Sequence, residues 1–503
     1  MASTRTVAKN TAFLTIGLMS GRLLSVFVFR KMSGALHAEG VGVVNLAIDV
    51  AAILLVVANY GLTNLITREI ARERRMTLPI MWSALQIRLV LAAFCYLVLI
   101  GYAWASGFDL LQRSALLIMG LGIFLEATAM ACDAVLQAHD MAQSQMWGQV
   151  ASAVAYFGFA YWWLDAGYGV MGVIWANVVS KVVRLVVMVP LMLLRTGPWL
   201  WRPAGRENVP ATDWRGLAKM AWPVFLSTTS GILYAKIDTP LLRAFRDSDA
   251  VGVYTLGRRG LDVLAMVPGQ FAIALFPVMV RAAAAGPASF ERITERSMRY
   301  LHLIILPLTL LCTLAAAPLT TWLAKGEVTF ADSVVVFRIM AWCLPFMAAT
   351  QVLNRMLFTA GRERDFAVIA LAPLAVNVGV NLLVIPRWGY LGASWAVCAT
   401  NAASTFMHWW YVRRAGLRLP LTRSLVHATV ALALAWLTAT GLTQFVAPRW
   451  GATWTALPIA AGTTPTLAVI GLTTLLYLPA MWFTRAVTPE DMPVIASLFR
   501  RGE

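Results

Sequence analysis

The sequence predicts an all-α protein that crosses a membrane about fourteen times. Of its 503 residues, 59% are hydrophobic and only 13% are charged, and the mean hydropathy is +0.71. Because a soluble protein carries roughly 25% charged residues, this composition excludes soluble, disordered and disulfide-scaffold classes. Two further observations support the prediction: apolar windows recur along the chain, and the lysine and arginine residues fall mainly in alternate loops between these windows.

About fourteen windows of about 20 mostly apolar residues follow one another, and each is long enough to cross a bilayer as a helix. The connections between them are too short to form a separate soluble domain. The first window contains Arg22 and precedes no small-residue cleavage site, so we expect a retained helix rather than a signal peptide. The window centres are Met19, Ala51, Ala92, Gly122, Ala155, Val179, Thr229, Met266, Leu311, Cys343, Val376, Thr400, Ala435 and Leu475.

The 41 lysine and arginine residues give the chain a net charge of +17 and fall mainly in alternate loops. With a cytoplasmic N-terminus, roughly 24 of them lie in inner loops and tails and about 8 in outer loops, as the positive-inside rule requires. This bias predicts that both termini are cytoplasmic. Of the basic residues within spans, Arg88, Arg338 and Arg355 are expected to snorkel from helix ends.

The sequence predicts no cofactor, no metal site and no enzymatic activity. The five cysteines lie singly in apolar runs, the five histidines do not cluster, and no GxxxxGK[ST] loop is present. A nucleic-acid partner is excluded despite the pI of about 10.2, because the basic residues are spread over many loops rather than gathered on one soluble face.

An internal repeat relates the two halves of the chain. Gly169-Val-Met-Gly-Val-Ile-Trp-Ala and Gly389-Tyr-Leu-Gly-Ala-Ser-Trp-Ala both read GxxGxxWA, and Gly40-Val-Gly-Val-Val resembles Ala250-Val-Gly-Val-Tyr. Each match joins spans six apart, which cross the membrane in the same direction. We therefore expect two six-helix lobes, at 1–200 and 201–418, related by a pseudo-two-fold axis along the membrane normal. Residues 419–503 then supply two additional helices and a short tail. This organisation favours a transporter that works by alternating access.

An ordered series of motifs resembles the polysaccharide-exporter branch of the multidrug/oligosaccharidyl-lipid/polysaccharide superfamily, which includes Wzx-type O-antigen flippases. The motifs are Ala38-Glu-Gly-Val-Gly-Val-Val, Tyr60-Gly-Leu with Thr67-Arg-Glu-Ile-Ala-Arg, Trp222-Pro with Tyr234-Ala-Lys-Ile-Asp-Thr-Pro-Leu-Leu, Phe276-Pro, and Asn377, Asn381, Ile385-Pro-Arg-Trp-Gly and Leu391-Gly-Ala-Ser-Trp-Ala.

The resemblance implies that the chain flips a polyprenyl-pyrophosphate-linked oligosaccharide, an O-antigen or exopolysaccharide repeat unit, across the bacterial inner membrane. The lipid bilayer, H⁺ or Na⁺ as a coupling ion, and the polysaccharide polymerase or export machinery are the implied partners. Lipid II flippase relatives share the fold and use their last two helices as a groove for the lipid tail, and the same is expected of the last two spans here.

An anionic pyrophosphate needs cationic partners inside the membrane, and arginine pairs with phosphate through its fixed fork. Arg22, halfway along the first span, is the first substrate-binding candidate, with an ion pair to Asp49 as the alternative or as a support. Arg258 and Arg259 of span eight are further candidates, and Arg258 also has Asp262 four residues away. The expected cavity lies between spans one, two, seven and eight.

Four more pairs of residues complete the predicted site. Lys181 and Arg184 share a helix face, with snorkelling as the alternative. Lys236 and Asp238 of span seven are substrate-binding candidates, although a structural role is open for Asp238. Glu126 and Asp133 share a face of span four, where they are candidates for ion coupling or for balancing the charge of the arginines. Asn377 and Asn381 are expected to form interhelical hydrogen bonds.

Three other functions are weighed against the flippase. A lipid II flippase shares the span number and Arg22. A drug/cation antiporter of the same superfamily is disfavoured, because Arg22 lies at a position in span one where an acidic residue would be needed to bind a cation. A membrane glycan polymerase or ligase would need catalytic side chains on a sizeable outer loop, and the outer loops here are short.

Overall fold

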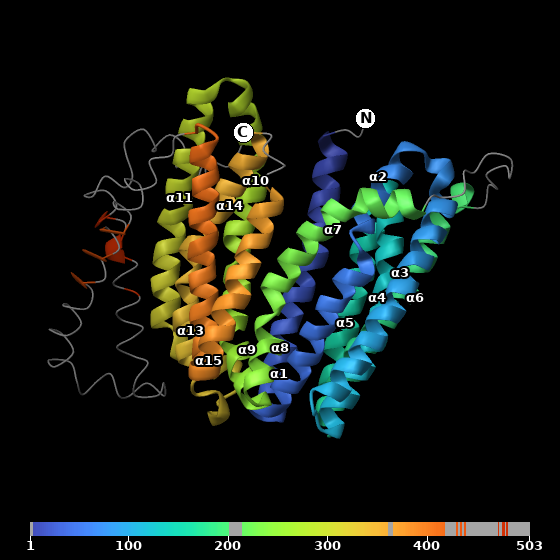
Figure 1. Cartoon of the computed structure of the whole chain (residues 1–503), viewed down its shortest axis with the longest axis horizontal. Helices are drawn as coiled ribbons and strands as arrows, with labels where there is room; N and C mark the ends of the chain where they lie inside the picture. Colours follow the sequence, from blue (N-terminus) through green and yellow to red (C-terminus); the bar gives the residue numbers. More distant parts are fainter. Residues whose placement is uncertain are drawn as a thin grey trace. The chain divides into compact units, whose positions relative to one another are not determined.

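The computed structural model describes residues 4–200, 214–360 and 366–417, together with 429–430, 433–434, 437–438, 471, 475–477 and 479–480 (Figure 1). Every regular element in this part of the chain is helical, which confirms the all-α prediction. The helices are α1 (Thr4–Asn59), α2 (Leu62–Arg72), η1 (Arg74–Met76), α3 (Thr77–Ala105), α4 (Leu110–Ala138), α5 (Ala142–Asp165), α6 (Gly169–Leu200), α7 (Trp214–Lys236), α8 (Asp238–Phe245), α9 (Ser248–Leu264), α10 (Met266–Ala284), α11 (Pro287–Leu314), α12 (Ala316–Leu323), η2 (Val328–Phe330), α13 (Ser333–Ala341), α14 (Cys343–Thr359) and α15 (Phe366–Arg414).

The chain forms two compact units. Unit 1 contains Met1–Leu256, Thr321–Ala331 and Leu374–Ala393, and unit 2 contains Gly257–Thr320, Asp332–Pro373 and Ser394–Glu503. The predicted lobes at 1–200 and 201–418 follow a different division of the chain and stay a prediction.

Eight helical stretches in the described part of the chain are long and apolar enough to cross a membrane. They contain the predicted span centres from Met19 to Gly122 and from Met266 to Thr400, as well as Val179. The remaining centres up to span twelve, Ala155 and Thr229, lie in α5 and α7. The last two predicted spans, and with them the predicted groove for a lipid tail, fall largely outside the described residues.

Two of the helices contain a kink where the sequence predicts a boundary between spans. α1 joins predicted spans one and two, and its backbone turns at His37, where φ is 56°. α15 joins predicted spans eleven and twelve, and it turns at Gly389, where φ is 54°. Each kink lies beside one of the repeated glycine motifs, so the repeat marks the places where the chain reverses direction.

The repeated Gly-Val segments of α1 and α9 lie directly against each other in unit 1. A Cβ atom on Gly42 would collide with the carbonyl oxygen of Ser248, and a Cβ atom on Gly252 would collide with the carbonyl oxygen of Ala38. Each of these carbonyls is four residues before the matching glycine. This reciprocal contact is what a two-fold relation between the two segments requires, and only glycine allows backbones to approach so closely.

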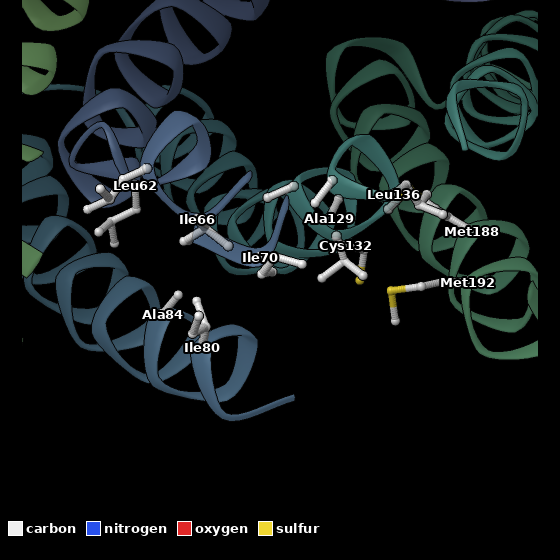
Figure 2. Close-up of a cluster of buried hydrophobic side chains, with 14 of the residues drawn as sticks. Leu62, Ile66, Ile70, Ile80, Ala84, Ala129, Cys132, Leu136, Met188 and Met192 are labelled. Atoms are coloured by element: carbon white, nitrogen blue, oxygen red, sulfur yellow. The ribbon is translucent and has the colours of Figure 1, made fainter. Parts of the chain in front are cut away.

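A hydrophobic cluster holds α4 in place within unit 1 (Figure 2). The short amphipathic helix α2 buries Leu62, Ile66 and Ile70 on one face, against Ala129 and Cys132 of α4. Residues of α3 and α6 and Ala221 of α7 (Trp214–Lys236) complete the cluster. Cys132 lies in the cluster, and the following residue, Asp133, faces Arg184 of α6.

Candidate functional site

A polar pocket lies among α1, α4, α5 and α6, entirely within unit 1, and it has a volume of about 390 Å³. Its walls are largely small or polar side chains. The lining residues are Gly17, Gly21, Arg22, Ser25, Glu126, Gln149, Ser152, Ala153, Tyr156, Asn177, Ser180, Lys181 and Arg184. The pocket that contains Arg22 is formed by spans one, four, five and six. The cavity that the sequence predicts between spans one, two, seven and eight stays a prediction.

Small residues let α1 approach α5 at the pocket. A Cβ atom on Gly17 would come within 2.8 Å of the side-chain oxygen of Gln149, and one on Gly21 would meet Ala153 at 3.9 Å. Arg22 follows directly and is exposed at the pocket wall. No ion pair involving Arg22 occurs in the described part of the chain.

α6 supplies two more cations. Lys181 and Arg184 both line the pocket, as their spacing along one helix face predicts. Lys181 lies over Gly122 of α4, where a Cβ atom would be 3.3 Å from its Nζ. Arg184 does not snorkel toward headgroups, because its side chain is only 12% exposed and faces α4.

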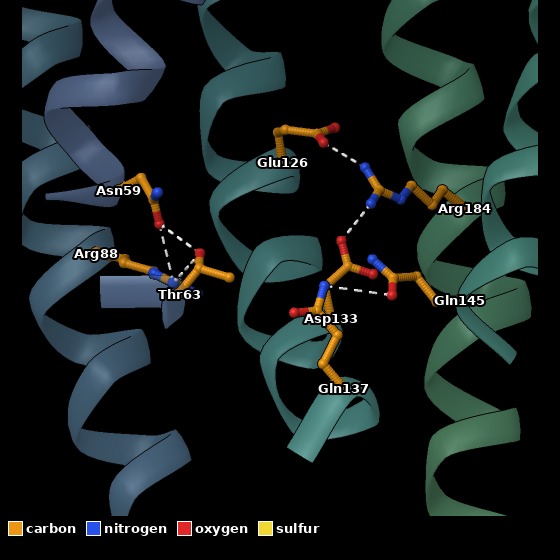
Figure 3. Close-up of polar contacts among 8 residues, drawn as sticks. All are labelled: Asn59, Thr63, Arg88, Glu126, Asp133, Gln137, Gln145 and Arg184. Carbon is orange, nitrogen blue, oxygen red and sulfur yellow. Dashed lines mark hydrogen bonds and ion pairs between the residues drawn. The ribbon is translucent and has the colours of Figure 1, made fainter. Parts of the chain in front are cut away.

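The two carboxylates of α4 hold Arg184 between them (Figure 3). Arg184 donates from Nη1 to Glu126 and from Nη2 to Asp133. The seven-residue spacing places both carboxylates on one face, toward Arg184, and the two roles that the sequence left open for them stay a prediction. An ion that binds at Glu126 Oε1 or at Asp133 Oδ2 has to displace Arg184 first.

Arg88 of α3 lies on the other side of α4 and is completely buried. Its Nη2 donates to Asn59 Oδ1 at 2.9 Å and to Thr63 Oγ1 at 2.8 Å (Figure 3). The expectation that Arg88 snorkels is therefore wrong. Its polar partners come from the corner between α1 and α2, and the sequence signal was the pair Asn59 and Thr63, four residues apart.

The region carries an excess of positive charge. Four cations, Arg22, Lys181, Arg184 and Arg88, accompany two carboxylates, which leaves two positive charges in excess. Among the lining residues that the structure describes, Glu126 is the one carboxylate. In a low-dielectric setting such an excess favours binding of an anionic group.

Asp49 belongs to a separate cluster. Its Oδ1 is 2.7 Å from Nζ of Lys236, and its Oδ2 accepts a hydrogen bond from Thr239 Oγ1 at 2.7 Å. The predicted ion pair between Arg22 and Asp49 is thus not formed. Asp49 and Lys236 do not line the polar pocket; they join α1 to α7 and α8.

Asp238 is also placed away from the pocket. It is completely buried, and its carboxylate accepts hydrogen bonds from Tyr254 at 2.9 Å and from Asn381 at 2.8 Å. Asn381 donates in addition to Asn377 Oδ1 at 3.0 Å. This network links α8, α9 and α15 in unit 1, and the structural role that the sequence left open for Asp238 fits its geometry.

Arg258 and Arg259 lie in unit 2, on α9, and are half-buried. Nε of Arg258 is 3.8 Å from Asp262 Oδ1, in the i,i+4 pair that the sequence offered. The described residues also contain no group of three His, Cys, Asp or Glu side chains that could hold a metal ion.

Residues 7–283 match a family model described as polysaccharide biosynthesis protein, and residues 223–383 match the MatE model. Among curated proteins, none gives a significant match. Among solved structures, the chain is similar to the lipid II flippase MurJ in an inward closed conformation. The TM-score is 0.69 and the identity 13%, over 94% of this chain and 98% of that chain.

Two transporters of the same superfamily are similar as well. An inward-facing multidrug resistance MATE family transporter gives a TM-score of 0.64 at 16% identity, over 81% of this chain and 98% of the other. A transporter from Pyrococcus furiosus, described as having a binding pocket of reverse polarity, gives 0.58 at 16% identity, over 82% and 95%. At these identities the likeness concerns the fold.

Proposed function

Since the chain belongs to the polysaccharide biosynthesis protein family, within the multidrug/oligosaccharidyl-lipid/polysaccharide superfamily of membrane flippases and transporters, we propose that it flips a polyprenyl-pyrophosphate-linked oligosaccharide. Transport runs from the cytoplasmic to the outer leaflet of a bacterial inner membrane. It proceeds by alternating access of two six-helix lobes, with both termini cytoplasmic. An O-antigen or exopolysaccharide repeat unit is the proposed cargo, passed on to polymerase or export machinery.

The observation that carries this proposal is the excess of positive charge at the polar pocket. Arg22 and Lys181 line it without a paired carboxylate in the described part of the chain, and a pyrophosphate supplies the missing negative charges. The guanidinium of Arg22 can bind two phosphate oxygens at once, and Lys181 adds a compact charge on the facing helix.

The uncharged polar residues of the pocket suit the first sugars of the cargo. Gln149, Asn177 and the lining serines present donors and acceptors for hydroxyl groups, and Tyr156 presents an aromatic ring. Glycan specificity in this proposal comes from these side chains, whereas the cations bind the pyrophosphate that all such lipids share.

A lipid II flippase has the same anionic linkage in its cargo, so the two functions differ in the sugar and not in the cations. An antiporter of organic cations fits the pocket poorly, because a cation would meet an excess of like charge. Coupling to H⁺ or Na⁺ through Glu126 Oε1 or Asp133 Oδ2 requires that the ion compete with Arg184 for that oxygen.

The proposal is tested by surface-glycan export in a strain that depends on this protein. Arg22→Ala removes a charge-assisted contact to phosphate, and we expect export to fall at least about tenfold while the protein remains in the membrane. Arg195→Ala is the matched control, because Arg195 is exposed on α6 outside the polar pocket. Normal export by Arg22→Ala would refute the role of the pocket. Restored growth of a strain lacking its lipid II flippase would assign the other cargo.

A further inference from the structure

Arg88 is a buried cation with incomplete local compensation. Its hydrogen bonds use Nη2 alone and go to two uncharged side chains, Asn59 and Thr63. Within the described part of the chain, its Nε and Nη1 are buried without a hydrogen-bond partner. A guanidinium in this position needs a negative charge nearby, because burial without one is strongly unfavourable.

Asp133 is the carboxylate that supplies this charge. It lies on α4 between the two arginines, with Arg88 on one side and Arg184 on the other (Figure 3). It forms an ion pair with Arg184, whereas the attraction between Asp133 and Arg88 acts across α4 without a direct contact. Its Oδ2 binds Arg184, whereas its Oδ1 is buried and has no hydrogen-bond partner in the described residues. One carboxylate thus serves two cations, and only one of its oxygens is engaged.

We propose that Arg88 is a positioning residue that shares Asp133 with Arg184 and so allows Arg184 to turn toward an anionic ligand in the polar pocket. This inference rests on the proposed function. When a pyrophosphate enters beside Arg22 and Lys181, Arg184 can exchange its bond to Asp133 for a bond to phosphate. Asp133 is not then left as an uncompensated buried charge, because Arg88 remains beside it.

The arrangement explains why a fixed ion pair lines a binding pocket. Without Arg88, Arg184 would be the sole counter-ion of Asp133 and would stay bound to it. With Arg88, the ligand gains a third cation. Glu126, the other partner of Arg184, lines the pocket and can exchange its charge partner for Lys181, which faces the same space.

The test measures binding of a short-chain polyprenyl pyrophosphate to the purified full-length chain. Arg88→Met removes the charge while keeping much of the volume, and we expect affinity to fall about tenfold, in the range of coupling within one charge network. Adding Asp133→Asn removes the carboxylate that traps Arg184, so the double variant should return to within about threefold of the wild type. Arg88→Lys keeps the charge and should bind nearly as the wild type does.

Thr63→Val is the matched control, because it removes a hydrogen bond to Arg88 without changing any charge. It should lower thermal stability and leave affinity unchanged. If Arg88→Met does not fold, the double variant decides the question: folding restored by Asp133→Asn supports the shared carboxylate, and failure to restore it contradicts the proposal.

Unchanged affinity in folded Arg88→Met, or no rescue by Asp133→Asn, would overturn the role of Arg88 while leaving the proposed function intact. If the wild-type chain itself does not bind the pyrophosphate, the proposed function fails, and this inference fails with it.

Discussion

At the scale of single residues, the pocket depends on where each charge finds its partner. Spacing along one helix predicted that Lys181 lies near Arg184 and Glu126 near Asp133, because i,i+3 and i,i+7 neighbours share a face. Partners on different helices could not be predicted in this way. Asp49 binds Lys236 rather than Arg22, since the pairing depends on how far each helix is rotated and shifted.

The position of Lys181 depends on the absence of a side chain at Gly122. Gly122→Val would place carbon atoms where the Lys181 chain now lies, and the ammonium group would leave the pocket. We expect pyrophosphate affinity to fall about tenfold, corresponding to the loss of one charged contact. Isothermal titration of the purified variant measures this.

Gly158→Val is the control for that change. Gly158 lies on α5, and a Cβ atom there would meet nothing within 4 Å. It should therefore leave affinity unchanged. Equal losses in both variants would indicate a general effect of valine on these helices and would contradict the assigned position of Lys181.

At the scale of helices, the sequence was most informative where the signal was local. Apolar windows predicted the helices because a span is recognised from about 20 consecutive residues. The positions of the kinks at His37 and Gly389 also followed from the repeated glycine motifs. The burial of Arg88 was missed, because the spacing of Asn59 and Thr63 indicates a shared polar face but not which residue of another helix packs against it.

The crossing of α1 and α9 provides a prediction at the same scale. Gly42→Ala and Gly252→Ala each introduce a Cβ atom against a backbone carbonyl, and we expect each to destabilise the fold by about 1–3 kcal/mol, as overpacking does. Thermal unfolding of the purified variants followed by circular dichroism measures the loss. Gly269→Ala of α10 has open space around it and should be neutral. A wild-type midpoint for both crossing variants would contradict the close contact.

At the scale of the whole molecule, composition and family membership agree on a multi-pass membrane protein of the flippase superfamily. The large net charge has two origins. By the sequence pattern, most basic residues fall in alternate loops. A smaller number lie within the helices, and three of these, Arg22, Lys181 and Arg184, line the polar pocket. Of the polar pocket, the sequence predicted the cationic side chains but not the location. Its location among α1, α4, α5 and α6 depends on tertiary packing.

We propose that the protein translocates a lipid because the headgroup of that lipid is anionic. The most direct measurement compares two fluorescent lipids in liposomes that contain the purified chain: a polyprenyl-pyrophosphate-linked oligosaccharide, and the same oligosaccharide joined to the polyprenyl chain through an uncharged ether. Quenching of the outer leaflet reports flipping. We expect the protein to accelerate flipping of the pyrophosphate lipid by a factor at least about tenfold larger than its acceleration of the uncharged lipid. Equal acceleration of both lipids, or of neither, would contradict it.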